Sequence, residues 1–469
     1  MRIVFISYLH PAVAPGGEQQ LAYELFQAAL RQGHDAYLIA ALEAEHEAVY
    51  GKPGAPIVPM PGEERQYFYF PQRYDFLHLS VGDWRSVQFL RELIERLAPE
   101  VVHFHHYHRV GVESIRAARQ AAPGAVIGMT FHEMMAICLA DGQMVKKNSR
   151  ELCQAASPVA CNKCFPDLRP EFVTLRAARL QAFLAECDVF VFPSEFLAER
   201  YVDWGLPPEK CVAIANGQVN LGDEFDRSQH SRQVNRFGFF GQFLDNKGVD
   251  VILDALLVLG REKRIPEAGI VVEINGGNKQ YATQAFLEKV LRQTEELKKV
   301  TTGRIEVRER GPYGRDQLAE RMASVDWVLV PSTWWEIFGL VVSEAWMFGR
   351  PVIASAIAGL KERITPGVNG FTFAPRDARA LADLMAALAG DEEQWSEVNE
   401  AIEQPWTEIE MFEAYRSVWD EIAEQRRIAP PAPAEPAAVE AAVTITRSKP
   451  KAARRGERAS EARKPTPVA

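Results

Sequence analysis

The amino-acid sequence predicts an α/β protein made of two doubly wound parallel-sheet domains and a disordered C-terminal tail. Three observations lead to this prediction. Short apolar segments alternate with segments of helical period, a glycine-rich turn joins the first such strand to the first helix, and a polar stretch without periodicity at 218–235 divides the pattern in two. At 469 residues the chain is also longer than a single compact core usually extends.

The first domain is expected over residues 1–218. Its opening consists of an apolar strand at 2–8, an Ala-Pro-Gly-Gly loop at 14–17, an amphipathic helix at 18–31 and a second strand at 35–40. This order is the βαβ unit of a Rossmann-like sheet. Further helices are expected at 86–97, 111–121 and 174–186, and further strands at 101–104, 125–130, 189–192 and 212–215.

The second domain is expected over residues 219–409, with the same alternation of strands and helices. Strands are expected at 237–240, 269–274, 305–308, 327–331 and 351–354, and helices at 248–261, 283–299, 315–323 and 339–348. A last amphipathic helix is expected at 410–426. Residues 428–469 are rich in Ala, Pro and charged residues and poor in large apolar ones, which predicts a disordered, basic tail.

Composition and charge narrow the functional classes. The net charge is −10, and residues 428–469 carry eight Lys or Arg against four Asp or Glu, so the remaining chain has a charge of −14. An acidic body argues against nucleic-acid binding, which needs a concentrated basic surface. We find neither an apolar run of membrane-spanning length nor a signal peptide, which predicts a cytoplasmic protein with reduced cysteines. The basic tail leaves room for peripheral contact with the inner face of the membrane.

The stretch 331–370 contains the most informative pattern. A strand ends near Pro331, a loop carries Glu336, and a helix begins near Gly339. The backbone of Ile337, Phe338, Gly339 and Leu340 would then present free N–H groups at a helix N-terminus, which favours binding of a diphosphate. Glu336 could accept hydrogen bonds from sugar hydroxyls. The alternative is that the glutamates here are merely solvated.

Glu344 lies eight residues after Glu336 and inside the predicted helix. Its neighbours are apolar, and an unpaired charge there would be costly. We therefore expect Glu344 to hold a ribose diol of a nucleotide. In a second stretch, 238–248, a strand runs into a loop whose Lys247 directly precedes a helix. The Lys247 ammonium could neutralise a diphosphate leaving group, although a lone motif of this kind also occurs by chance.

Together these segments resemble the retaining glycosyltransferases of family 4, whose GT-B fold consists of two facing Rossmann-like domains. The similarity runs over about residues 1–425 and is carried by 241–248, Glu336-x7-Glu344, 349–352, Gly16-Gly17, 130–133, Pro193-Ser194 and Asn216-Gly217. The resemblance implies transfer of a sugar from a nucleoside diphosphate sugar, with retention, to an unknown hydroxyl acceptor. That acceptor would be a saccharide, a lipid-linked molecule or a small molecule, held chiefly by residues 1–218.

The resemblance also assigns roles to single residues. Lys247 would hold the diphosphate, Glu336 the sugar hydroxyls and Glu344 the ribose, while His132 would meet the sugar from the first domain and Gly17 would allow close approach. The helix at 410–426 would pack back on the first domain. No cofactor is expected for catalysis. One departure matters: Gln242 stands where the family usually has Arg, so one expected positive charge on the diphosphate is missing.

Two further groups of side chains could bind metals. Cys138, Cys153, Cys161 and Cys164 fall within 27 residues. Cys161-x2-Cys164 has the spacing of a zinc knuckle, so a structural zinc and simple reduced thiols both remain open. The histidines at 103, 105, 106 and 108 crowd one strand end, where acceptor contact or loop polarity is favoured over a metal. The aromatic run 67–70 could form an exposed patch or pack under a loop.

Other functions on the same architecture also remain open. A sugar-nucleotide epimerase or hydrolase would bind the same donor without an acceptor. A non-catalytic nucleotide-sugar-binding or partner-binding protein is an alternative that Gln242 leaves open. A dinucleotide dehydrogenase is disfavoured, because this sequence has no clear Gly-x-Gly-x-x-Gly motif after a strand.

Overall fold

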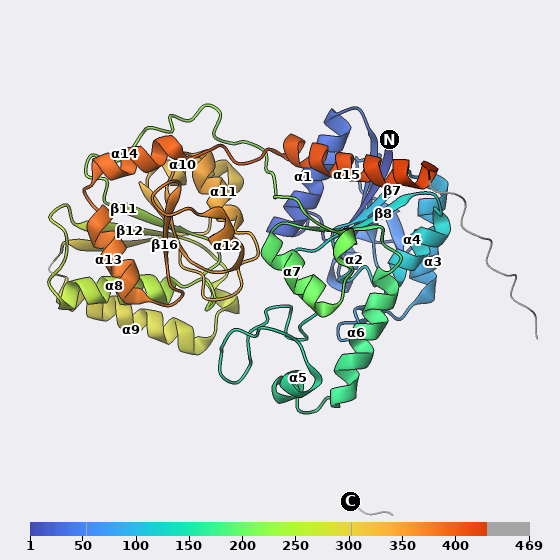
Figure 1. The fold of residues 1–469 in the computed structure, drawn as a ribbon, viewed down its shortest axis with the longest axis horizontal. Coiled ribbons are helices and arrows are strands. Elements are labelled where there is room, and N and C mark those ends of the chain that lie inside the picture. Colours follow the sequence, from blue (N-terminus) through green and yellow to red (C-terminus); the bar gives the residue numbers. More distant parts are fainter. Residues whose placement is uncertain (53, 302, 429–469) are drawn as a thin grey trace, which may run out of the picture. The chain divides into compact units, whose positions relative to one another are not determined.

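The computed structural model describes residues 1–52, 54–301 and 303–428, which form two parallel sheets covered by helices (Figure 1). The predicted tail at 428–469 lies, except for its first residue, outside these residues. The first sheet has the strand order β10-β9-β8-β7-β1-β2-β4-β3. Its strands are β1 (Arg2–Tyr8), β2 (Asp35–Ala41), β3 (Ile57–Pro59), β4 (Gln66–Tyr69), β7 (Val101–Phe104), β8 (Val126–Thr130), β9 (Val189–Phe192) and β10 (Cys211–Ala213).

All strands of this sheet are parallel except the edge strand β3, which pairs antiparallel with β4. Residues Ile3 to Ile6 of β1 are fully buried, because helices cover both faces of a parallel sheet and its central strands need apolar side chains on each side. The helical elements here are α1 (Gly17–Arg31), η1 (Ala44–His46), α2 (Glu47–Tyr50), α3 (Trp84–Leu97), α4 (Glu113–Ala121), α5 (Pro158–Cys164), α6 (Pro170–Leu184), α7 (Glu195–Trp204) and η2 (Pro208–Lys210). A small hairpin pairs β5 (Tyr74–Asp75) with β6 (Ser80–Val81).

The C-terminal helix α15 (Glu408–Ile428) packs against this first sheet, beside α1 (Figure 1). Its buried Phe412 and Trp419 share an apolar cluster with Phe5 of β1. Polar contacts reinforce the packing: Trp419 Nε1 donates to His103 Nδ1 at 3.3 Å, and the hydroxyls of Tyr415 and Thr130 lie 2.9 Å apart. The chain therefore returns to the first sheet after completing the second.

The second sheet is entirely parallel, with the order β13-β12-β11-β14-β15-β16. Its strands are β11 (Arg236–Phe240), β12 (Ile270–Asn275), β13 (Ile305–Gly311), β14 (Trp327–Val330), β15 (Val352–Ser355) and β16 (Gly370–Phe373). Its helical elements are α8 (Val249–Arg261), η3 (Lys279–Tyr281), α9 (Gln284–Val300), η4 (Arg315–Gln317), α10 (Leu318–Ala323), α11 (Leu340–Met347), α12 (Ala358–Arg363), α13 (Ala378–Leu388) and α14 (Glu392–Ala401). Both sheets thus have the doubly wound form that the sequence predicts.

The structure differs from the sequence prediction in several places. The aromatic run at 67–70 is no surface patch, because Phe68, Tyr69 and Phe70 are buried in and directly after β4. The strand expected at 212–215 is Cys211–Ala213, and helix α5 lies within the cysteine-containing insertion.

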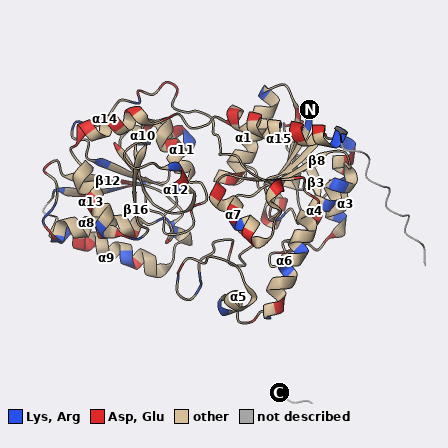
Figure 2. Cartoon of the chain, viewed as in Figure 1, with Lys and Arg blue, Asp and Glu red and all other residues tan. Residues whose placement is uncertain are grey.

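Acidic and basic residues are interspersed along the helices, for example on α3 (Figure 2). Within the described part of the chain, no helix combines the length and apolarity needed to cross a membrane.

The topology directs the predicted site residues to the carboxyl ends of the strands. Gly17 begins the helix that follows β1, and His132 comes two residues after β8. In the second sheet, Lys247 follows β11, and Glu336 follows the neighbouring strand β14. Loops at the carboxyl ends of doubly wound parallel sheets are the usual place for ligand sites.

Candidate active site

A cavity of about 400 Å³ gathers loops from the carboxyl ends of both sheets. Its walls are formed by Gly17, Glu18, Leu21, His132, Pro193, Asn216, Phe239, Phe240, Gly241, Gln242, Lys247, Val330, Ser332, Trp334, Glu336, Ile337, Phe338, Gly339, Leu340 and Val341. Nine of the predicted site residues are in this set. A larger cavity of about 610 Å³ lies beside α3, but it contains none of the residues predicted for catalysis or donor binding, so the smaller one is the candidate site.

The loop between β11 and α8 holds Lys247 against the end of β14. Gly248, the next residue, has a φ of +80°, and a Cβ built there would lie 2.0 Å from the carbonyl oxygen of Pro331. Only glycine fits this close approach. The N–H of Thr333 also donates to the carbonyl of Asn246 at 2.9 Å. The two loops are thereby tied together, which brings the side chains of Lys247 and Glu336 face to face.

Glu336 accepts three hydrogen bonds on one carboxylate oxygen. Lys247 Nζ and Ser332 Oγ each lie 2.8 Å from Glu336 Oε2, and Trp334 Nε1 lies 3.2 Å from it. Burial favours the uncharged carboxyl, but the charge of Lys247 and these hydrogen bonds outweigh it and hold the pKa of Glu336 below its usual value. All three contacts go to Oε2, so Oε1 is left to receive a hydrogen bond from a ligand.

Helix α11 points its N-terminus at the same cavity. Gly339 precedes the helix with a φ of +78°, and a Cβ there would lie 2.6 Å from Leu360. Arg363 fixes the approach to the helix by donating to the carbonyls of Phe338 and Gly339 at 3.2 and 2.9 Å. Burial lowers the pKa of Arg363 to about 9. The first N–H groups of any helix lack partners within the helix, so this end can bind an anion.

Glu344 does not line the cavity with the other predicted residues. Burial raises its pKa, against the nearby positive charge of Arg315 and a hydrogen bond with Gln218. Arg315 also forms an ion pair with Glu24 of α1. Glu344 therefore interacts with Arg315 and Gln218, which do not line the cavity, while Lys247 and Glu336 are in direct contact within it.

His132 and Gly17 form part of the wall on the side of the first sheet. His132 Nε2 lies 3.3 Å from His105 Nδ1, and the two rings stack. Burial lowers the pKa of His132 to about 4, so its ring is uncharged at neutral pH. A Cβ on Gly17 would lie 2.8 Å from the Leu340 side chain. A side chain at position 17 would thus intrude on the helix that the diphosphate would approach.

Gln242 is exposed and lines the cavity, and no second cation on the described cavity wall replaces the Arg expected at this position. Lys247 is the one Lys or Arg among the described residues that form the cavity wall. Sequence reasoning also missed three contributors. Ser332 and Trp334 donate hydrogen bonds to Glu336, and Glu18 lines the cavity directly after Gly16 and Gly17. All three residues lie next to a motif recognised in the sequence, and this proximity is the signal that could have indicated them.

The two groups considered as metal sites do not assemble in this structure. The six cysteines are free thiols. In the described part of the chain, no group of three or more His, Cys, Asp or Glu is arranged to hold a metal ion. Zinc bound by Cys138, Cys153, Cys161 and Cys164 remains a sequence-based hypothesis, which elemental analysis of the purified protein would decide. His103 is instead a packing residue, hydrogen-bonded to Thr130 at 2.7 Å and to α15.

Family models match both halves of the chain. The model for glycosyltransferase family 4 matches residues 15–218, and that for glycosyl transferases group 1 matches residues 234–391. Curated proteins named D-inositol 3-phosphate glycosyltransferase are also similar. The protein from Xylanimonas cellulosilytica is 32% identical over 33% of this chain and 34% of its own, and that from Corynebacterium urealyticum 31% identical over 39% and 42%. The chain thus matches less than half the length of these relatives.

Solved structures show the same architecture at low sequence identity. Anabaena HepE in complex with UDP superimposes with a TM-score of 0.61 at 16% identity, covering 90% of this chain and all of that one. Sucrose-phosphate synthase from Thermosynechococcus elongatus gives a TM-score of 0.58 at 16% identity, covering 91% and 98%. The predicted GT-B fold is therefore confirmed. Since the two family models together span most of its length, the chain belongs to glycosyltransferase family 4.

Proposed function

We propose that this protein is a retaining glycosyltransferase, which transfers a sugar from a nucleoside diphosphate sugar to a hydroxyl group of an acceptor. The observation that supports this most strongly is the contact between Lys247 and Glu336 beside the tip of α11. It supports the proposal because a cation and free helix N–H groups could bind a diphosphate, next to a carboxylate with an open oxygen for a sugar hydroxyl.

The proposed reaction breaks the bond between the anomeric carbon and the diphosphate oxygen and forms a bond from that carbon to the acceptor oxygen. The acceptor attacks from the face that the diphosphate leaves, and its proton passes to the departing phosphate, so no protein nucleophile is needed. Lys247 and the N-terminus of α11 stabilise the negative charge that develops on the leaving group. Glu336 Oε1 orients the sugar, and uncharged His132 contacts it from the other wall.

The relatives support a nucleoside diphosphate donor. The HepE structures that resemble this fold contain UDP, UDP with glucose, or UDP-glucose. We propose that Glu344 and the adjoining Arg315 and Gln218 form the nucleoside side of the donor site. The acceptor would lie against residues 1–218, and the carbohydrate chemistry of the related proteins favours a saccharide, a lipid-linked sugar or a small hydroxylated molecule.

A panel of nucleotide sugars tests the proposal. A donor at 100 times its dissociation constant should stabilise the protein by about 2.7 kcal/mol, which a thermal-shift assay detects. The best donor is then incubated with candidate acceptors, and the anomeric configuration of the product is determined by NMR. Transfer with inversion contradicts the proposed mechanism.

The other outcomes identify the alternatives. A free sugar as the main product indicates a hydrolase, and a changed sugar on the nucleotide indicates an epimerase. Donor binding without turnover of any kind indicates a binding protein, the alternative that Gln242 leaves open because it cannot replace a cation on the diphosphate. Stabilisation by no nucleotide sugar contradicts the whole proposal.

A further inference from the structure

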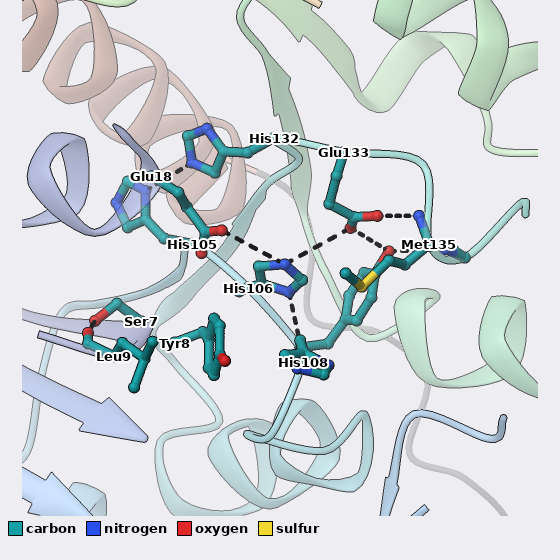
Figure 3. A network of polar contacts seen from close by, with 12 residues as sticks. Ser7, Tyr8, Leu9, Glu18, His105, His106, His108, His132, Glu133 and Met135 are labelled. Carbon is teal, nitrogen blue, oxygen red and sulfur yellow. Dashed lines mark hydrogen bonds and ion pairs between the residues drawn. The ribbon is translucent and has the colours of Figure 1, made fainter. Parts of the chain in front are cut away.

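The wall of the cavity on the side of the first sheet is acidic. Glu18, the second residue of α1, lines this wall together with His132. The Glu18 side chain is 16% exposed. Its Oε2 lies 3.5 Å from His106 Nε2, while Oε1 is buried and has no hydrogen-bond partner within the described structure (Figure 3). A buried carboxylate oxygen without a partner is costly unless a ligand supplies a donor.

The neighbouring His106 offers a hydrogen-bond donor to Glu18 Oε2 but none to Oε1. Its Nδ1 accepts the backbone N–H of His108 at 2.8 Å, so the ring proton of the neutral imidazole is on Nε2. Burial holds the pKa of His106 well below its usual value, so the ring is uncharged. That single N–H faces two carboxyl groups, with Nε2 3.5 Å from Glu18 Oε2 and 3.9 Å from Glu133 Oε1. A neutral donor shared in this way does not neutralise either carboxyl.

Glu133 differs from Glu18 because its own hydrogen bonds are provided by the protein. The Tyr107 hydroxyl donates to Glu133 Oε1 at 2.7 Å. The backbone N–H of Met135 donates to Glu133 Oε2 (Figure 3). Burial, followed by the charge of Glu133, raises the pKa of Glu18 well above its usual range. Of the two carboxyls, Glu18 is therefore the one that needs a partner from outside the protein.

Positive charges in this region are directed elsewhere. Arg176 donates to the carbonyl oxygens of Leu77, Met135 and Ala136. Arg109 lies 3.6 Å from Glu43, with which it forms an ion pair. Lys247, the only cation on the described cavity wall, is paired with Glu336 on the opposite side. Burial disfavours negative charge at this place, and a phosphate beside Glu18 would add such charge with no cation on the described cavity wall free to offset it, whereas a hydroxyl or ammonium group would supply the missing donor.

We propose that Glu18 binds the acceptor through a hydrogen bond from a hydroxyl or ammonium group, and that it selects neutral or amine-bearing acceptors against phosphorylated ones. This inference rests on the proposed function, since it concerns the acceptor side of the same cavity. It also separates this chain from the curated relatives, whose name, D-inositol 3-phosphate glycosyltransferase, contains a phosphorylated compound.

Matched pairs of small molecules test the selection by charge. The probes are myo-inositol, glucose and glucosamine, each compared with its monophosphate. Binding to the full-length protein is measured by calorimetry, both with UDP at saturation and without it. We expect the better of the unphosphorylated probes to bind about tenfold or more tightly than its phosphorylated partner, because the phosphate would bring uncompensated negative charge into a partly buried site.

Variants connect this preference to Glu18. Glu18→Gln keeps the shape and removes the charge, and should reduce the preference to about threefold or less. Glu18→Lys should reverse it. Circular dichroism and the thermal-shift response to the best donor check that both variants are folded and have an intact cavity. Glu45→Gln, an exposed substitution on the same domain, makes the same change in net charge and should leave the preference intact.

The outcomes separate the two proposals. A wild-type preference for phosphorylated probes, a preference that survives Glu18→Gln, or binding of none of the unphosphorylated probes overturns the role of Glu18. Failure of the wild-type protein to bind any nucleotide sugar overturns the proposed function instead. The probe titrations without UDP still measure the charge preference in that case.

Discussion

Lys247 Nζ lies 2.8 Å from Glu336 Oε2, so the cation proposed to bind the diphosphate is paired with the carboxylate proposed to bind the sugar. The two side chains come from loops that follow neighbouring parallel strands. A bound donor would place its phosphates next to Lys247 and its sugar next to Glu336, and would weaken the ion pair by sharing Lys247. In the proposed function, donor binding and donor orientation would therefore be coupled through one contact.

Removing either partner should impair transfer strongly. Lys247→Ala and Glu336→Ala should each cost roughly 2–5 kcal/mol in kcat/KM, the range for truncating one side of a buried charged pair. This corresponds to about 30- to 5,000-fold. Steady-state kinetics with the best donor measures it. Lys279→Ala, which breaks an exposed ion pair with Glu309 in the same domain, is the control and should change little. Near-normal turnover in both test variants would remove the proposed site.

Restoring the missing charge should increase activity. Gln242 lines the cavity without a cation beside it, so Gln242→Arg should raise kcat/KM by roughly 10–100-fold, the gain from one added hydrogen bond to a charged group. Gln280→Arg makes the same charge change at an exposed position outside the cavity and serves as the control. An unchanged or lower rate in Gln242→Arg would show that the diphosphate does not pass this residue.

Glu133 should make stability depend on pH. Burial raises its pKa from the ordinary 4.5 to about 7. Between those values the folded protein binds a proton that the unfolded chain releases, so the free energy of unfolding should fall as pH rises and level off above about 7. Glu133→Gln cannot ionise. Its stability relative to the wild type should therefore increase by roughly 1–3 kcal/mol from pH 5 to pH 8.

Urea denaturation at the two pH values measures the Glu133 effect. Glu421→Gln, at an exposed position on α15, is the control and should show no such change relative to the wild type. If Glu133→Gln and the wild type lose stability in parallel over this range, Glu133 is not the group that takes up the proton.

The C-terminal helix should contribute strongly to the stability of the first domain. Trp419 is 1% exposed in the cluster shared with β1 and donates a hydrogen bond to His103. Trp419→Ala should cost about 3–5 kcal/mol, the range for large aromatic residues removed from a core. The unfolding midpoint in urea measures the loss. Trp84→Ala, at a position that is 72% exposed, should change the midpoint little. Equal effects would contradict the assigned packing.

Local sequence patterns predicted the central strands and the loops at their carboxyl ends. The run 2–8 and the Lys247 loop carry their structure in adjacent residues, through unbroken apolar strands and glycines required by close approach. The strand β16 was not predicted because it is short and begins with a glycine. The sequence leaves open whether the aromatic residues of β4 form an exposed patch or pack inside, because their burial depends on the neighbouring strand β2, which no local pattern reveals.

The same distinction applies to the site. Lys247 and Glu336 were found because each lies in a recognisable loop. The contact between Glu18 and His106 joins residues 88 positions apart, on α1 and after β7, and depends on β1 and β7 being neighbours in the sheet. Similarly, the sequence places Glu344 on a helix but not the rotation of that helix, which turns it toward Arg315.

The return of α15 to the first sheet determines where the chain can be cut to build chimeras with related proteins. The chain passes between the sheets twice, and the passages adjoin, because the N–H of Gln218 donates to the carbonyl of Trp406 at 3.0 Å. A chimera cut once, after residue 218, would combine the first sheet with a foreign terminal helix and leave Phe412 and Trp419 without their partners. Experiments that exchange the proposed donor site should therefore replace the second sheet as one segment between residues 218 and 407 and retain the native final helix.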